Sequence, residues 1–201
     1  MSDTAFGTFF LPGPTEVRRP VLEAMLKPMI GHRVAEMEQL MGGVQPRLKK
    51  IFRTGRPVYV SASSATGLME GAVRNGARRR VLSLVNGAFS ERFFQITLAT
   101  GLGADALEVE WGGGHTAEML RDALRRGDYD AVTVVHSETS TGALNPIGEL
   151  AAVVREFDDV VILVDSVSGL SGADMRTDEW GVDFVLTGSQ KALALPPGLA
   201  F

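Results

Sequence analysis

The chain has 201 residues, of which 45% are hydrophobic and 22% charged, and its net charge is −4. This length predicts one or two domains, and the composition is that of a folded globular protein rather than a disordered chain. No stretch approaches the roughly 20 apolar residues of a membrane span, and residues 1–4 carry no secretory signal. We therefore expect a cytoplasmic protein with no membrane partner. The negative charge argues against nucleic acid as a partner, and the absence of cysteine excludes disulfides, thiolate zinc sites and thiol nucleophiles.

The N-terminal part, residues 1–56, is expected to form an arm with helices rather than part of a sheet. Prolines make residues 9–15 an extended segment, and Pro20 suits the first turn of a short helix that runs to Met25. Apolar residues then recur at spacings of three and four over 34–52, which predicts an amphipathic helix. Pro46 interrupts this pattern, so we expect a kink there or two separate helices.

Residues 57–201 alternate between strand-like and helix-like segments. The predicted strands are short runs rich in Val, Ile and Leu: 58–61, 81–85, 106–110, 131–135, 160–164 and 184–186. The predicted helices lie between them, near 66–75, 90–100, 116–126 and 147–157. This alternation is typical of an α/β domain with a mostly parallel, doubly wound sheet flanked by helices. Residues 195–201 look like the start of a further strand, so we expect the domain to continue beyond the given sequence.

Asp165 follows the apolar strand predicted at 160–164, at the sheet edge where parallel sheets bind ligands. A carboxylate buried there needs a partner that favours its charged form. Three readings stay open: a structural hydrogen bond or helix cap, an anion that faces a cationic ring nitrogen, or a metal ligand. The metal is the least favoured, because no second acidic residue or histidine lies nearby at ligand spacing. We therefore predict no metal site.

Lys191 stands in an unusual environment for a lysine. It is one of only four lysines, and Asp183 is the only other charged residue between positions 182 and 201. Desolvation would lower the pKa of its amine and make it a nucleophile toward carbonyls. The plainer interpretation is a lysine whose stem packs while its amine reaches solvent.

The segment 62–67 consists of small and hydroxylated residues that open a predicted helix. Such a helix start leaves backbone N–H groups free to bind a phosphate, although an ordinary helix cap explains it as well. The sequence has neither GxxxxGK[ST] nor GxGxxG, which leaves little support for nucleoside triphosphates or dinucleotides. A phosphate cradle, an acidic partner and a desolvated lysine together fit pyridoxal 5′-phosphate.

Several motifs resemble those of a known family. They are Gly-Ser-Gln-Lys-Ala-Leu at 188–193 with Pro-Pro-Gly at 196–198, Val-Asp-Ser-Val at 164–167, Glu-Thr-Ser-Thr-Gly at 138–142, Asn-Gly-Ala-Phe at 86–89 and Pro-Gly-Pro-Thr at 12–15. The sequence thereby resembles the class V aminotransferases of PLP fold type I, especially the alanine–glyoxylate and serine–glyoxylate (serine–pyruvate) branch. The resemblance implies the large domain of that fold, with the C-terminal small domain absent from this chain.

The resemblance also implies the roles of the central residues. Lys191 would form the internal aldimine with pyridoxal 5′-phosphate and later move the proton between the substrate carbon and the cofactor. Asp165 would keep the pyridine nitrogen protonated, so that the ring takes up carbanion electrons. Thr139 would donate a hydrogen bond to the phenolic oxygen. Phe89 would stack on the ring, and Val167 would line the cofactor site.

The phosphate would be held at a helix start by Ser64, Ala65 and Thr66, with help from Gln190. Relatives commonly have Ser-Gly-His at 64–66, so Ala65 and Thr66 depart from the pattern but leave the backbone N–H donors in place. Pro12, Gly13 and His32 are the candidate substrate residues, with His32 in a loop that approaches the site near the partner subunit. His136 follows a strand, and could line the site or be a core histidine.

By resemblance the complete protein would be a homodimeric transaminase that moves an amino group from alanine or serine to glyoxylate or pyruvate. The 201 residues alone would be inactive. One alternative is another class V enzyme: a 2-aminoethylphosphonate transaminase, a cysteine desulfurase or a kynureninase-like hydrolase. Desulfurases usually have a histidine where Phe89 stands, which counts against that option. The other alternative is a non-catalytic α/β binding module, in which Lys191 and Asp165 merely form a salt bridge.

Overall fold

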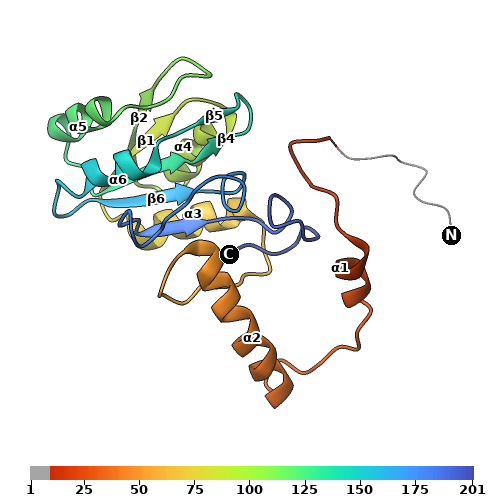
Figure 1. The fold of residues 1–201 in the computed structure, drawn as a ribbon. Coiled ribbons are helices and arrows are strands. Elements are labelled where there is room, and N and C mark those ends of the chain that lie inside the picture. Colours follow the sequence, from red (N-terminus) through yellow and green to blue (C-terminus); the bar gives the residue numbers. More distant parts are fainter. Residues whose placement is uncertain (1–9) are drawn as a thin grey trace.

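A five-stranded parallel sheet forms the centre of the molecule (Figure 1). The computed structural model describes residues 10–201; residues 1–9, which include Phe9 of the predicted arm and the segment 1–4, lie outside it. In spatial order the strands are β2 (Gly103–Glu108), β1 (Arg80–Val85), β3 (Ala131–Val135), β6 (Val161–Asp165) and β7 (Phe184–Leu186). Because β2 and β3 lie on opposite sides of β1, the sheet is doubly wound, as predicted.

Helices cover both faces of the sheet and bury its side chains. One face packs against α3 (Ala65–Gly76) and α4 (Ala88–Ala99), and the other against α5 (Ala117–Arg126) and α6 (Ile147–Val154). In β3, Val132 and Val134 belong to one core while Ala131 and Val135 belong to the other. This two-sided burial explains why β3 is continuously apolar.

The carboxyl ends of three neighbouring strands are level with one another. Asp165 at the end of β6 pairs with Val135 at the end of β3 and with Leu186 at the end of β7. A short hairpin that the sequence did not predict, β4 (Ser137–Glu138) with β5 (Ala143–Leu144), follows β3 directly. Residues that follow β3, β6 and β7 are therefore brought to one edge of the sheet.

The N-terminal part contains α1 (Arg19–Ala24) and α2 (Ala35–Phe52), and Figure 1 shows α1 apart from the sheet. Of the two outcomes expected at Pro46, a kink or two separate helices, the second is wrong, because α2 runs through that residue. Its C-terminal half is held in place by Leu48 and Phe52, which are buried in the core. The Gln45 side chain also donates to the Val58 carbonyl (2.6 Å) and accepts from the Val58 N–H (3.2 Å).

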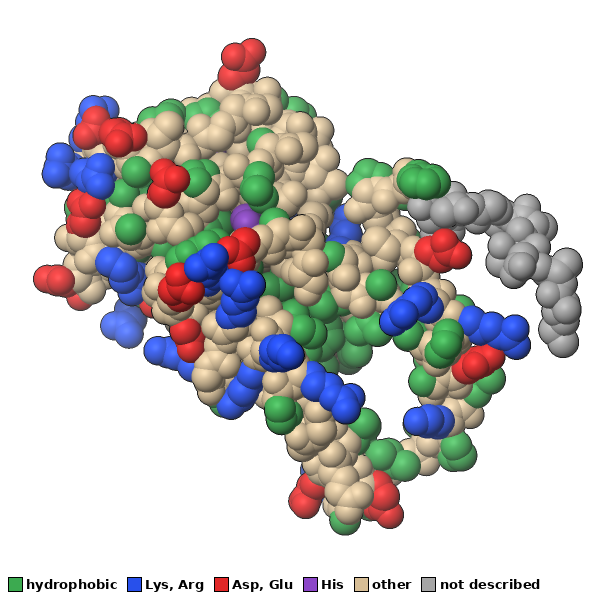
Figure 2. Space-filling view, in the orientation of Figure 1, with side chains coloured by type: hydrophobic (Ala, Val, Ile, Leu, Met, Phe, Trp, Pro, Cys, Tyr) green, Lys and Arg blue, Asp and Glu red, His purple; other side chains and the backbone are tan. Residues whose placement is uncertain are grey.

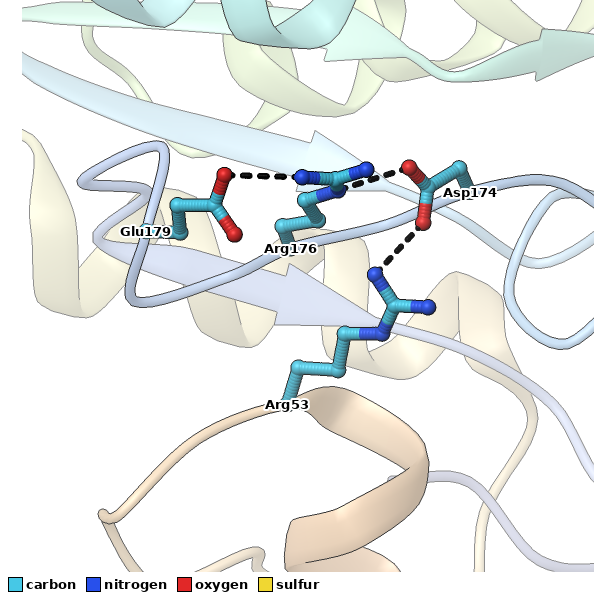
Figure 3. A network of polar contacts seen from close by, with 4 residues as sticks. All are labelled: Arg53, Asp174, Arg176 and Glu179. Atoms are coloured by element: carbon cyan, nitrogen blue, oxygen red, sulfur yellow. Dashed lines mark hydrogen bonds and ion pairs between the residues drawn. The ribbon is translucent and has the colours of Figure 1, made fainter.

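Ionic contacts attach the end of α2 to the loop between β6 and β7 (Figure 3). Asp174 accepts from Arg53 Nη1 and from Arg176 Nε, both at 2.7 Å, and Arg176 Nη1 lies 2.8 Å from Glu179 Oε1. These side chains are about half exposed, so each pair contributes little, about 1 kcal/mol or less. The network therefore orients the end of α2 more than it stabilises the fold.

One predicted strand is wrong and another is shifted. Residues 58–61 form no strand; only Ser61 pairs, in an isolated antiparallel bridge with Ala200, and Tyr59 is 83% exposed. The strand expected at 106–110 is β2, which begins and ends earlier. The strand-like segment at the end of the chain pairs antiparallel with β7's extension, through the bridge of Ala200 with Gly188. Ala200 thus lies between Gly188 and Ser61 and bridges to both.

Candidate active site

All nine predicted cofactor-binding residues line one cavity at the carboxyl edge of the sheet. They come from the start of α3, the start of α4 and the segments that follow β3, β6 and β7: Ser64, Ala65, Thr66, Phe89, Thr139, Asp165, Val167, Gln190 and Lys191. The cavity has five further lining residues, which the sequence did not single out: Met69, Arg92, Val135, Ser137 and Ser168. The fold thus assembles the candidate residues from five separate segments.

Asp165 is 2% exposed and makes a single side-chain hydrogen bond, in which its Oδ1 accepts from the Val167 N–H at 2.8 Å. Among residues 10–201, no hydrogen bond reaches its Oδ2 atom. Burial raises the pKa of this carboxyl to about 7, against the opposing effect of the Val167 N–H. The carboxylate is therefore costly to keep charged until a cation faces it, which is expected of a binding residue rather than a structural one.

Lys191 lies in the loop after β7 and is half-buried. Burial lowers the pKa of its amine, with the charge of Asp165 acting in the opposite direction. Its Nζ atom donates to the carbonyl of Pro12 at 2.7 Å, and in residues 10–201 it forms no ion pair with Asp165. The salt bridge that the binding-module alternative requires is therefore absent from the described chain.

The loop that carries Lys191 is fixed by a buried serine. Ser189 Oγ donates to the Pro196 carbonyl at 2.6 Å and accepts from the Leu199 N–H at 3.3 Å. The Ser189 backbone pairs with Leu199 and Leu195 as well. These contacts close the loop into a compact turn, which holds Lys191 at the cavity.

The start of α3 carries the predicted phosphate cradle. Ser64 caps the helix, because its Oγ accepts from the Gly67 N–H at 3.3 Å, so the ordinary capping role is present. The N–H groups of Ala65 and Thr66 belong to the first turn and have no partner inside the helix. They are free to bind an anion at the positive end of the helix dipole.

A family model of class-V aminotransferases matches residues 74–201. The chain belongs to this family. It is 44% identical to an uncharacterized aminotransferase of Methanocaldococcus jannaschii over 94% of its own length and 50% of that protein. It is 34% identical to serine–glyoxylate aminotransferase of Arabidopsis thaliana, over 94% of this chain and 49% of the relative. The chain thus spans about half the length of the curated relatives it matches.

The fold agrees with that of solved class-V aminotransferases. The crystal structure of alanine–glyoxylate aminotransferase from Nostoc sp. aligns with a TM-score of 0.91 at 31% identity, over the whole of this chain and 54% of that one. The predicted PLP fold type I large domain is therefore confirmed. In residues 10–201 we find no helix long and apolar enough to cross a membrane, and no group of three potential metal ligands.

In this class-V aminotransferase chain, the predicted stacking residue Phe89 is at the first turn of α4. The guanidinium of Arg92, one helical turn later, lies 5.4 Å from the centre of the Phe89 ring. Such a cation–π contact favours a fixed ring orientation. Arg92 also lines the cavity, and its spacing of three from Phe89 is the helical signal that could have identified it from sequence.

Thr139 has a partner that the sequence analysis missed. Its Oγ1 lies 2.6 Å from Ser168 Oγ, and both hydroxyls border the cavity. Each hydroxyl has one proton to donate. If Ser168 donates to Thr139, the Thr139 proton is free to be donated to an acceptor in the cavity.

Two of the three predicted substrate residues lie at Lys191, and the third does not. Pro12 accepts the lysine's hydrogen bond, and a Cβ added at Gly13 would meet Lys191 Nζ at 2.6 Å. His32 is exposed and does not border the cavity of its own chain, so its role near a partner subunit stays a prediction. His136 is a core histidine, 2% exposed, with Nδ1 3.0 Å from Ser166 Oγ.

Proposed function

We propose that the chain is the cofactor-binding part of a pyridoxal 5′-phosphate-dependent aminotransferase. The enzyme would move an amino group from a small amino acid, alanine or serine, to glyoxylate or pyruvate. One observation carries this proposal: Lys191 and the buried Asp165, whose Oδ2 has no partner among residues 10–201, line the same cavity. The relatives named serine–glyoxylate and alanine–glyoxylate aminotransferase support this choice of substrates.

The chemistry of the lining residues fits the cofactor, which carries a phosphate, a ring nitrogen and an aldehyde. The N–H groups of Ala65 and Thr66, which have no partner inside the helix, suit a phosphate, and Gln190 lines the same cavity. A ring nitrogen that carries a proton would stabilise the charged form of Asp165 and offset the cost of its burial. The amine of Lys191 is the group that would bond the aldehyde.

When bound, the cofactor supplies a carbonyl that accepts the amino group and a ring that withdraws electrons from the substrate's α-carbon. Lys191 would take the proton from that carbon and return it, since its lowered pKa favours the neutral amine. Asp165 would hold a proton on the ring nitrogen. Thr139 would donate to the phenolic oxygen, and the Phe89 ring would cover one face of the cofactor.

We further infer that the complete protein is a homodimer. Helix α1 buries none of its side chains, and the apolar Met25, Leu26 and Met29 beside it are 67%, 83% and 99% exposed. Figure 2 likewise has hydrophobic side chains along this arm that the rest of the described chain leaves uncovered. A second copy would cover them and bring residues such as His32 to the neighbouring site.

The test of cofactor binding uses the complete protein incubated with pyridoxal 5′-phosphate. We expect a visible absorbance band that borohydride bleaches, with one cofactor fixed per chain at Lys191. Lys191→Ala should abolish the fixed cofactor, whereas Lys50→Ala, at an exposed lysine of α2, should leave it unchanged. A wild-type protein that binds no cofactor would overturn the proposal and favour the binding-module alternative.

The substrates are tested by half-reactions of the loaded enzyme. Serine, alanine, 2-aminoethylphosphonate and cysteine are offered in turn, and loss of the visible band reports transfer of the amino group. Glyoxylate or pyruvate should then restore the band. Turnover restricted to cysteine or to 2-aminoethylphosphonate would assign the chain to another class-V reaction.

A further inference from the structure

Glu138 is a fully buried carboxylate that forms no salt bridge within residues 10–201. Instead, its oxygens accept hydrogen bonds from the start of α4 and from its own hairpin. Oε2 accepts from the Ser90 N–H (2.9 Å), the Ser90 hydroxyl (3.0 Å) and the Phe89 N–H (3.1 Å). Oε1 accepts from the Ser140 hydroxyl (2.6 Å) and the Ser140 N–H (3.1 Å).

This carboxylate joins two cavity walls. Phe89 donates to it directly, and Thr139 is its neighbour in the chain. Ser140 adds a second link, because its hydroxyl also accepts from the Ala88 N–H at 2.9 Å. The approach is so close that a Cβ at Gly87 would lie 2.5 Å from Glu138 Cγ. The start of α4 and the segment after β3 are thus held together through the side chains of Glu138 and Ser140.

We propose that Glu138 is a positioning residue, which sets the Phe89 ring and the Thr139 hydroxyl at a fixed separation across the cofactor cavity. The inference rests on the proposed function, because Phe89 would cover one face of the cofactor ring and Thr139 would donate to its phenolic oxygen. A carboxylate suits this task, since both of its oxygens accept. A glutamine of the same shape would direct its NH₂ group at some of the donors and lose their hydrogen bonds.

Glu138 also influences Asp165, the buried acid of the cavity. Hydrogen bonds from Ser140 and Ser90 keep the pKa of Glu138 low despite its burial, so it stays ionised. Its charge adds to the effect of burial in raising the pKa of Asp165. A neutral residue at 138 would therefore alter both the geometry and the charge around the cofactor.

Asp130 serves as a control that separates an effect on cofactor binding from an effect on stability alone. Asp130, which is 8% exposed, accepts from the N–H groups of Arg78 (2.8 Å), Arg79 (2.9 Å) and Arg80 (3.1 Å). It does so at the opposite edge of the sheet, before β3. Asp130 is thus a second buried carboxylate that binds backbone donors, remote from the cavity.

The experiment compares Glu138→Gln with Asp130→Asn in the complete protein. Both should lower the temperature of unfolding. Only Glu138→Gln should weaken the binding of pyridoxal 5′-phosphate, by about tenfold, as expected when charged hydrogen bonds are lost. It should also reduce the visible circular dichroism per bound cofactor, which reports how the ring is held. Equal effects of the two variants on binding and dichroism, or no effect of Glu138→Gln, would overturn the inference.

A double-variant cycle tests whether Glu138 acts through Phe89. If it does, Glu138→Gln combined with Phe89→Leu should weaken cofactor binding by less than the product of the two single effects, because only the contribution through Thr139 remains once Phe89 is replaced. Multiplicative effects would contradict the role.

If Glu138→Gln does not fold, Ser140→Ala can be used instead, because it removes the shortest hydrogen bond to Glu138. This variant should weaken cofactor binding about threefold, and an unchanged affinity would count against the inference. If the wild-type protein shows no visible absorbance band with pyridoxal 5′-phosphate, the proposed function itself is overturned. If the wild type binds the cofactor and the variants bind it equally well, only the role of Glu138 is overturned.

Discussion

The amine of Lys191 lies 2.7 Å from the carbonyl oxygen of Pro12, although the two residues are 179 positions apart in the sequence. Two further bonds join the same segments: Thr15 N–H donates to the Gln190 carbonyl (2.9 Å) and Thr15 Oγ1 to the Lys191 carbonyl (2.8 Å). The arm thus holds both the backbone and the side chain of the lysine. Its Pro12 carbonyl is left without this donor once Lys191 bonds another group.

Gly13→Ala should impair the enzyme without unfolding it. The new Cβ would lie 2.6 Å from Lys191 Nζ, and the backbone at φ +140° disfavours any side chain. We expect a loss of kcat/KM on the order of 10- to 100-fold, because the lysine is displaced. Gly42→Ala, in α2 with open space around it, is the control and should have no effect on turnover. Equal activity of the two variants would refute a close fit at Gly13.

Asp165→Asn should stabilise the cofactor-free protein at neutral and alkaline pH while weakening cofactor binding. The folded-state pKa of about 7 lies above the ordinary value of 3.8, so the folded protein holds this proton more tightly than the unfolded chain does. The cost of burying the carboxylate is thus absent below about pH 4, grows as the pH rises, and is complete above about pH 7.

The raised pKa of Asp165 sets how much stability the Asp165→Asn variant should gain. We expect the free energy of unfolding at pH 8 to rise by about 1–4 kcal/mol, and the difference from wild type to vanish near pH 4. Denaturant unfolding of cofactor-free protein over this pH range measures it. A stability difference that does not depend on pH would show that Asp165 does not titrate near neutrality.

Ser168→Ala should weaken cofactor binding through Thr139. Without the 2.6 Å partner, the Thr139 hydroxyl loses the hydrogen bond that orients it, and we expect a three- to tenfold increase in the dissociation constant of pyridoxal 5′-phosphate. The control is Ser83→Ala, which breaks a similar pair of hydroxyls, Thr133 with Ser83 at 2.8 Å, inside the sheet. That variant should lose stability and keep its affinity for the cofactor.

Asp174→Ala should have a small effect on stability. It removes the contacts to Arg53 and Arg176, whose side chains are about half exposed, so we expect a loss of about 1 kcal/mol or less. Added salt should reduce the difference from wild type, because it screens exposed charges. A loss of several kcal/mol in thermal or denaturant unfolding would mean that this network holds α2 in place.

The sequence was sufficient to predict the sheet and the side chains at its strand ends. Asp165 and Lys191 could be found because each is an isolated charge next to an apolar run, and the parallel sheet brings such positions to one edge. The segment 58–61 was misassigned, because its apolar pattern does not reveal that residues near 200 take the neighbouring position. Which segment pairs at this place depends on residues that are far apart in the sequence.

Other residues at or next to the cavity were not predicted for the same reason: their partners are distant in the sequence. The link from Glu138 to the start of α4 gives no local signal, since Phe89 and Ser90 lie almost 50 positions earlier. Ser168 becomes significant only when the segments after β3 and β6 are side by side. Arg92 alone could have been found locally, from its helical spacing to Phe89.

The contact between the arm and Lys191 also has a consequence for biosynthesis. During translation, residues 12–15 leave the ribosome long before residues 190 and 191, so their binding partners do not yet exist. The arm has to wait, unpaired, while the strands of the sheet are made, and closing so long a loop is slow compared with local folding. The arm can therefore take its place against Lys191 only after residues 190 and 191 have been made.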